Sequence, residues 1–140
     1  MSSLSEIDLL DGAMKPIEKG SGNCLNIRAV FRRGESRSVT LRVRSSPDEQ
    51  EYHDIHYHWE IGRLILDRSH SSLNPIVKKD VLGLDVYLDE SVLEVFVDQL
   101  SAFAARIYPT LAASTGVLVG SEGAKASLEI ITVARIKRTR

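Results

Sequence analysis

The chain has 140 residues, of which 43% are hydrophobic and 26% are charged, and its formal net charge is −1. This length and composition are typical of one globular domain, and they exclude a disordered or fibrous chain. A net charge so close to zero provides no overall field to attract nucleic acid or an anionic membrane, so we expect neither as a partner. The single cysteine, Cys24, excludes an internal disulfide and is expected to be a small buried side chain.

The two ends of the chain bear on its location. The opening segment MSSLSEIDLLDG has acidic residues where a signal peptide has basic ones, and it lacks the apolar core of such a peptide. No apolar run reaches the roughly 18 residues of a membrane-spanning helix, and there is no N-glycosylation sequon. The sequence as written therefore predicts a cytoplasmic protein, or an extracellular one if the chain is a piece of a secreted enzyme. Residues 137–140 are expected to be a solvated basic tail.

Taken in chain order, the sequence is dominated by segments in which apolar and polar residues alternate. Glu6–Leu10 is predicted to be an edge strand, and a loop containing glycine, proline and lysine is expected from there to residue 22. Clearer alternation follows in residues 25–32, 39–44, 64–67, 84–89, 93–98 and 128–135. Because successive side chains of a strand point to opposite faces, each segment predicts a strand with one buried and one solvated face.

Turn-forming residues separate these segments at short intervals, for example Arg33-Gly34-Glu35 and Glu60-Ile61-Gly62. No long segment has the apolar spacing of a helix, and the nearest one, Glu90–Arg106, reads better as a strand at VLEVFV. Ser69–Lys79 is expected to be the longest and most mobile loop. We therefore predict one domain over residues 1–140. We expect it to be all-β, an antiparallel two-sheet sandwich of jelly-roll or lectin-like type with about nine or ten strands.

The histidines are the first candidates for a functional site. On a strand, His56 and His58 share a face at a spacing that suits a metal ion, whereas His53 has the opposite parity. The sequence shows no third ligand. We therefore interpret these histidines as solvent-facing side chains and expect no metal site.

The same segment is rich in aromatic residues, and two interpretations remain open. Tyr52, Tyr57 and Trp59, together with His56 and His58, would form a carbohydrate-binding surface if the rings were exposed, because aromatic rings stack on sugars. Alternatively, Tyr57 and Trp59 are core side chains, because they share the parity of the apolar Ile55 on a strand.

Carboxylates are numerous but do not by themselves indicate catalysis. A retaining glycosidase needs two of them facing each other about 5–5.5 Å apart, and the sequence does not show such a pair. Glu94 with Arg106, and Asp67 with Arg68, are interpreted as ion pairs and turn caps. There is no nucleophile elbow, phosphate-binding loop, dinucleotide fingerprint or zinc motif, so no cofactor is expected.

Three blocks of sequence carry a family resemblance. LILDRS ends in Asp67, Arg68 and Ser69, and GAKASLEIITVARI closes the domain. The middle block contains D-x-S-x-x-E-x-F and then R-x-Y-P, formed by Asp89, Ser91, Glu94, Phe96, Arg106, Tyr108 and Pro109. In their order along the chain, across Leu25–Ile136, the blocks resemble the C-terminal β-sandwich domain of glycoside hydrolase family 32. This family contains invertases, inulinases, levanases and fructosyltransferases.

The resemblance implies structural roles for these motif residues. Asp89 and Ser91 are expected to bond amide groups in a turn, and Glu94 and Arg106 to form a cross-strand ion pair. Pro109 is expected to end a strand because it has no N–H to donate. The family's catalytic groups lie in an N-terminal propeller with N-D-P-N, R-D-P and E-C motifs, none of which occurs here. No catalytic residue is therefore assigned, and the chain by itself is expected not to be an enzyme.

Two functions follow as hypotheses. In the first, the chain is a non-catalytic accessory or carbohydrate-binding module that is related to fructan- and sucrose-active enzymes. In the second, it is a structural or interaction protein whose former propeller-facing surface forms a homodimer or binds a partner, such as a separate propeller chain, because an uncovered apolar patch must be buried.

Overall fold

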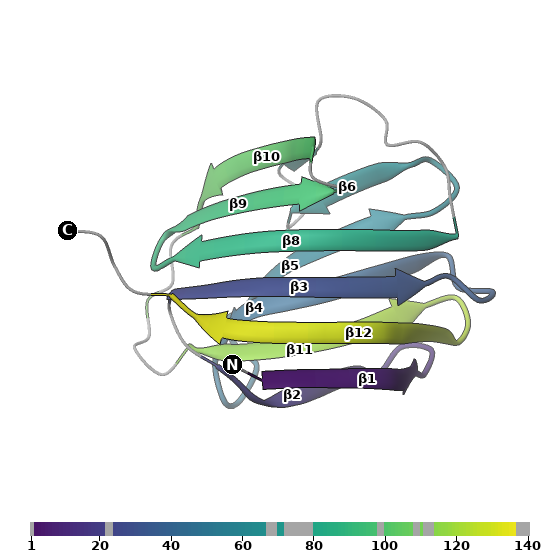
Figure 1. Ribbon diagram of the computed structural model, residues 1–140, viewed down its shortest axis with the longest axis horizontal. Helices are drawn as coiled ribbons and strands as arrows, with labels where there is room; N and C mark the ends of the chain where they lie inside the picture. The colour runs from purple at the N-terminus through teal and green to yellow at the C-terminus, as the bar shows by residue number, and fades with distance from the viewer. Residues whose placement is uncertain are drawn as a thin grey trace.

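The computed structural model describes residues 2–21, 24–66, 70–71, 80–97, 100–107, 110 and 114–136. Within these residues the chain forms twelve β-strands and no helix, and the strands lie in two stacked sheets of six strands each (Figure 1). Neighbouring strands within each sheet are antiparallel. The predicted all-β, two-sheet sandwich is confirmed, with more strands than the sequence predicted.

Each sheet combines segments that are distant in sequence. The first sheet contains, in spatial order, β1 (Ser2–Leu9), β12 (Ala126–Arg135), β3 (Cys24–Arg32), β8 (Val81–Asp89), β9 (Val92–Val97) and β10 (Leu100–Arg106). The second sheet contains β2 (Met14–Ser21), β11 (Gly116–Glu122), β4 (Ser38–Ser45), β5 (His53–His58), β6 (Arg63–Leu66) and β7 (His70–Ser71). The strands β8 to β10 and β4 to β7 follow one another as neighbours, whereas the remaining connections cross between the sheets.

The hydrophobic core lies between the two sheets and follows the predicted alternation. On β3 the inward residues Leu25, Ile27, Ala29 and Phe31 are buried, and on β8 so are Leu82, Leu84, Val86 and Leu88. The second sheet contributes Val39, Leu41 and Val43 from β4, and Ile55 and Tyr57 from β5. Each large apolar side chain buried in this way stabilises the fold by about 1.5–3 kcal/mol. The strand prediction for VLEVFV is also confirmed, since it forms β9.

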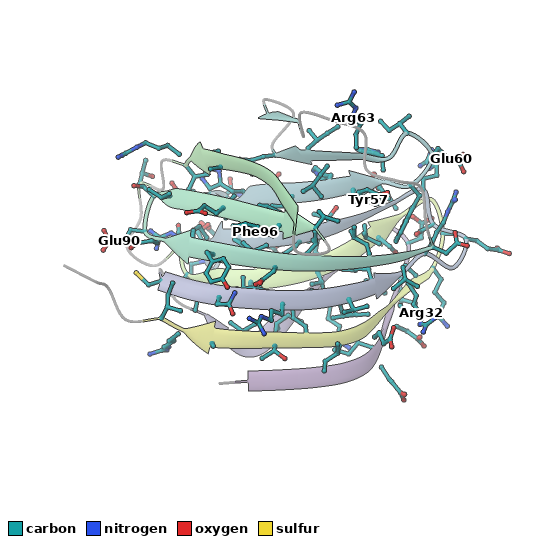
Figure 2. The ribbon with its side chains drawn as sticks, turned by 45° about the horizontal axis from the view of Figure 1, so that its top comes forward. Arg32, Tyr57, Glu60, Arg63, Glu90 and Phe96 are labelled. Carbon is teal, nitrogen blue, oxygen red and sulfur yellow. The ribbon has the colours of Figure 1, made fainter. Side chains whose placement is uncertain are left out.

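Two aromatic side chains fill the core beneath β5. Tyr57 and Trp59 are 0% and 1% exposed, and their rings meet edge to face with centroids 5.0 Å apart. The Trp59 indole N–H donates to the Ser36 hydroxyl at 3.1 Å, so its polar atom is satisfied. The Tyr57 hydroxyl, in contrast, is buried without a hydrogen-bond partner. Figure 2 shows Tyr57 between the sheets and Phe96 on the outward side of the first sheet.

The expectation for the N-terminal segment was wrong in one respect. The predicted edge strand is present as β1, at the edge of the first sheet, but the predicted loop forms β2, the edge strand of the second sheet. Ile17 provides the reason, because its side chain is 4% exposed and belongs to the core. Pro16 is compatible with this strand because an edge position leaves one side of the backbone without a ladder partner.

Some predicted features fall on residues that the structure does not describe. These are the basic tail at 137–140 and most of the predicted long loop at 69–79, although residues 70 and 71 of that loop form β7. The described residues contain no helix that is long and apolar enough to cross a membrane.

The unpaired Tyr57 hydroxyl leads to a stability prediction. Tyr57→Phe removes a buried polar group that has no partner, so the free energy of unfolding should stay the same or rise by about 1 kcal/mol. Trp59→Phe, the matched comparison, loses the bond to Ser36 and leaves a cavity, and it should cost roughly 2 kcal/mol. Urea unfolding followed by circular dichroism measures both. A clear loss of stability in Tyr57→Phe would show that the hydroxyl is bonded in the folded protein.

Candidate functional site

A polar cluster lies on the outer face of the second sheet, where β4 and β5 pair. Thr40 is directly opposite His56, and Arg42 is opposite Asp54, so four polar side chains form two adjacent cross-strand pairs. They line a hollow of about 150 Å³. Its other lining residues come from the β1–β2 connection, β2 and β11: Gly12, Met14, Ser121 and Glu122.

The four side chains hold one another in place through hydrogen bonds. The Arg42 guanidinium donates to both carboxylate oxygens of Asp54, from Nε at 2.7 Å and from Nη2 at 3.0 Å. The Thr40 hydroxyl and His56 Nδ1 are 2.8 Å apart, and His56 Nε2 lies 3.7 Å from Asp54 Oδ2. A bidentate pair of this kind is rigid as well as strong. The cluster is therefore ordered before any ligand arrives.

Burial makes this cluster unlike an ordinary surface ion pair. The side chains of Arg42 and Asp54 are 13% and 10% exposed, and that of His56 is 23% exposed. The hydrogen bond that the Arg42 guanidinium donates to Asp54 raises the pKa of the guanidinium, although burial opposes the shift. The Arg42 guanidinium therefore stays charged in the neutral pH range, and it lines the hollow together with Asp54.

Tyr52 extends the cluster to the protein surface. Its ring lies against Arg42, with 3.7 Å between the guanidinium carbon and the ring centroid, and 42% of the residue is exposed. Glu49 adds a carboxylate 3.0 Å from Arg42 Nη1. The site thus combines a partly exposed aromatic ring, which Arg42 covers on one face, with charged donors and acceptors.

His58 lies beside His56 on the same outward face, as predicted. The two ring centroids are 6.2 Å apart. The pKa of His58 is lowered from its usual value because burial disfavours the imidazolium and because His56 adds repulsion, while the Glu122 carboxylate acts in the opposite direction. The described residues contain no group of three or more histidine, cysteine or carboxylate side chains placed to hold a metal ion.

The charges around the hollow favour a neutral ligand. Asp54, Glu49 and Glu122 carry negative charge, and Arg42 is the cation bonded to the first two of these carboxylates. A phosphate or carboxylate ligand would meet this excess of carboxylates at close range, which is costly in a partly desolvated site. Hydroxyl groups, by contrast, both donate to carboxylates and accept from guanidinium and imidazole.

The structure separates the residues that were grouped as a carbohydrate surface. Tyr52, His56 and His58 lie on the outward side with at least part of each side chain accessible. Tyr57 and Trp59 point into the core, so their rings cannot stack on a ligand, and the alternative interpretation of them as core residues is the one observed. The sequence alone did not identify Thr40, Arg42 and Asp54. Their signal was the position of polar residues on the outward faces of β4 and β5, and it can be interpreted only when the register of the two strands is known.

The family-motif residues lie elsewhere, mostly at the β8–β9–β10 end of the first sheet. The Ser91 main-chain carbonyl accepts the Ile107 N–H at 2.8 Å, and the Cys24 thiol donates to Asp89 Oδ1 at 3.4 Å. The expected bonds from the Asp89 and Ser91 side chains to turn amides stay a prediction. Phe96 packs edge to face on Tyr87, with centroids 5.9 Å apart. Asp67, Arg68, Ser69, Tyr108 and Pro109 lie outside the described residues.

The expected ion pair between Glu94 and Arg106 is not found among the described residues, and the prediction is corrected. Glu94 is opposite Ala104, so Arg106 lies on the same face but one diagonal step away, opposite Val92. Both side chains are exposed, and the ion pairs found among the described residues do not include this one. The parity argument was right, but parity does not specify register.

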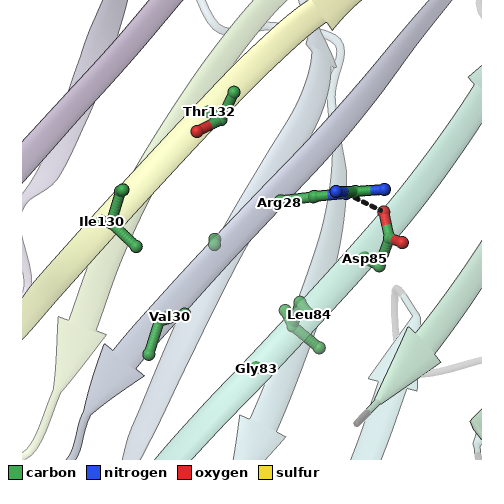
Figure 3. Close-up of a pocket in the computed structure, with 8 residues that line it drawn as sticks. Arg28, Val30, Gly83, Leu84, Asp85, Ile130 and Thr132 are labelled. Carbon is green, nitrogen blue, oxygen red and sulfur yellow. Dashed lines mark ion pairs between the residues drawn. The ribbon is translucent and has the colours of Figure 1, made fainter. Parts of the chain in front are cut away.

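A second hollow, of about 420 Å³, lies on the outer face of the first sheet, on the opposite side of the sandwich. It is lined by Arg28, Ala29, Val30, Gly83, Leu84, Asp85, Ile130 and Thr132 (Figure 3). This hollow is larger than the first, but it is more apolar and has fewer hydrogen-bonding groups.

The lowered pKa of His58 predicts a pH-dependent stability. The unfolded chain, in which a histidine pKa is about 6.5, binds more protons than the folded chain, so the free energy of unfolding falls as pH decreases through this value. The fall stops below the lower pKa of the folded state. His58→Gln should reduce the difference in urea midpoint between about pH 7.5 and about pH 5.5. An unchanged difference would contradict the prediction.

Comparison with solved structures shows which proteins share this fold. An exo-inulinase from Aspergillus awamori matches 96% of this chain with a TM-score of 0.73 at 19% identity, and fructan 1-exohydrolase IIa from Cichorium intybus matches 99% with a TM-score of 0.80 at 15% identity. This chain spans only 29% and 36% of those two proteins. A galectin from Caenorhabditis elegans matches 91% of this chain and 96% of its own length, with a TM-score of 0.60 at 12% identity.

Sequence comparison identifies the family. A comparison with curated proteins finds no significant match. The family model described as glycosyl hydrolases family 32 C terminal, however, matches residues 5–135, which is nearly the whole chain. This agrees with the resemblance noted in the sequence. The chain belongs to the C-terminal domain family of the family 32 glycosyl hydrolases.

Proposed function

We propose that this chain is a non-catalytic, carbohydrate-binding accessory domain, and that its ligand is a neutral, fructose-containing sugar. The observation that carries the proposal is the pre-ordered cluster of Thr40, Arg42, Asp54 and His56, which lines a hollow beside the exposed ring of Tyr52. An isolated ion pair on a sheet surface contributes little to stability. A half-buried network that surrounds an open hollow has a different use, because its remaining donors and acceptors are available to a ligand.

The class of sugar is taken from the family. The solved structures that share this fold include an exo-inulinase, a β-fructofuranosidase and a fructan 1-exohydrolase in complex with 1-kestose. Identities of 14–19% support a common fold only. The excess of negative charge around the hollow independently favours a neutral sugar over an acidic one.

The absence of catalysis is part of the proposal. The family match covers only the C-terminal domain. Asp54 accepts hydrogen bonds from Arg42 at both of its oxygens, so its carboxyl group is engaged within the cluster. Hydrolysis of sucrose or inulin by the purified chain would contradict this part of the proposal.

Isothermal titration calorimetry tests the binding. The purified chain should bind at least one of sucrose, a short inulin oligomer and levan with a dissociation constant of about 1 mM or lower. Tyr52→Ala and His56→Ala should each weaken binding by roughly tenfold or more, because His56 lines the hollow and Tyr52 provides the aromatic ring beside it. Tyr87→Ala, an exposed tyrosine on the opposite sheet, is the matched control and should bind normally.

The variants must remain folded for the comparison to hold. Tyr52 is an exposed residue in the connection before β5, and His56 is outward-facing, so neither substitution opens the core. Trp59→Ala is unsuitable because it would leave a core cavity. Absence of heat with all three sugars, or equal affinity in Tyr52→Ala and His56→Ala, would reject the proposed site.

A further inference from the structure

The outer face of the first sheet has an uncovered apolar centre. At that centre Val30 of β3 is directly opposite Gly83 of β8, and the missing side chain at Gly83 leaves the hollow of about 420 Å³. Ile130 borders the hollow and is 40% exposed, and Tyr87 on the same face is 37% exposed. Apolar surface of this kind, bordered by polar residues, is suited to the centre of a protein–protein interface.

One pair of charges lies immediately beside this centre. Arg28 is opposite Asp85, one step along the same two strands, and Arg28 Nε lies 3.6 Å from Asp85 Oδ1 (Figure 3). The guanidinium side chain is 66% exposed, so this internal pair leaves most of it in solvent. The carboxylate also accepts a bond from Asn26 Nδ2 at 2.6 Å, which holds it in a defined position.

We propose that this face binds the same face of a second copy of the chain, with a two-fold axis that runs parallel to the strands between β3 and β8. Such an axis places β3 of each copy opposite β8 of the other copy. Each Arg28 then faces Asp85 of the second copy, and each Val30 enters the hollow above Gly83 of the second copy. The pairing of β3 with β8 thus makes the surface self-complementary in both charge and shape, as a two-fold interface requires.

Charge complementarity selects this axis over its alternatives. A parallel axis that passes through β3 would place Arg28 against Arg28. An axis across the strands at Val30 would place Arg28 near Arg32, which lies four residues along β3 on the same face. Like charges at close range are strongly unfavourable in an interface. Of these three axes, only the one between β3 and β8 places both copies of Arg28 against a carboxylate.

The available area suits a stable dimer. Six strands of six to ten residues, spaced about 4.8 Å apart with a rise of about 3.3 Å per residue, give a face of roughly 650 Å² per copy. Specific interfaces bury about 800 Å² per partner. The proposal is independent of the sugar site, which lies on the opposite sheet and would stay open. A dimer would direct two such sites away from each other, so binding to a multivalent polysaccharide would gain avidity.

Sedimentation velocity across about 1 to about 100 µM protein tests the proposal. The wild-type chain should dimerise within this range. Arg28→Asp should raise the dissociation constant by roughly 100-fold or more, because it creates two like-charge contacts. Gly83→Ile should have a similar effect because its side chain fills the hollow that Val30 enters. The double variant Arg28→Asp with Asp85→Arg exchanges both charges and should dimerise again.

The controls separate this surface from a general loss of folding. Lys15→Asp makes the same change of charge at an exposed residue of β2, in the other sheet, and should leave the dimer intact. Arg28→Asp should keep the circular dichroism spectrum of the wild type, which shows that the monomer is folded. A wild-type chain that is monomeric at every concentration would overturn the proposal. A dimer that persists in Arg28→Asp and Gly83→Ile would also overturn it.

Discussion

The burial of Tyr57 and Trp59 between the sheets is the constraint on which the rest of this structure depends. Both side chains are almost completely inaccessible, and they pack against each other beneath β5. Because a strand directs successive residues to opposite faces, placing Tyr57 inward forces His56 and His58 outward. The core therefore orients the polar face. A slip of one residue would bury the histidines and expose the aromatic rings, which explains why the register is strongly specified.

The next constraint is the pairing of β4 with β5. The connection between them is held by Ser46, whose hydroxyl donates to Asp48 at 2.7 Å and accepts the Glu51 N–H at 3.0 Å. This connection sets which residues are opposite across the two strands. Thr40 is thereby placed against His56 and Arg42 against Asp54, and Glu49 and Tyr52 of the connection itself complete the surroundings of Arg42. The same short loop thus determines the register and supplies part of the site.

The two outer faces of the sandwich differ in a way that suits two roles. The second sheet has a small hollow among charged and hydroxyl groups that are already bonded to one another. The first sheet has a larger apolar hollow with one exposed ion pair beside it. A small polar ligand matches the first arrangement, and a second protein surface matches the other. Since the core separates the two faces, occupation of one does not obstruct the other.

The sequence by itself determined the class of fold, the single core and the family. Alternation in segments such as 25–32 and 93–98 reports one buried face per strand, and this local pattern was sufficient to predict the sandwich. It also predicted that His56 and His58 share a face. It did not reveal β2, because the apolar signal there rests chiefly on Ile17 in a segment that also contains proline and glycine.

The tertiary structure decided which residues of neighbouring strands are opposite one another, and both proposed sites depend on these cross-strand pairs. Arg42 and Asp54 are twelve positions apart, and Val30 and Gly83 are 53 positions apart. Parity assigns each residue to a face but not to a partner, as the missing Glu94–Arg106 pair shows. Register depends on loop geometry and on the packing of the whole core, which are properties of the folded chain and not of any local segment.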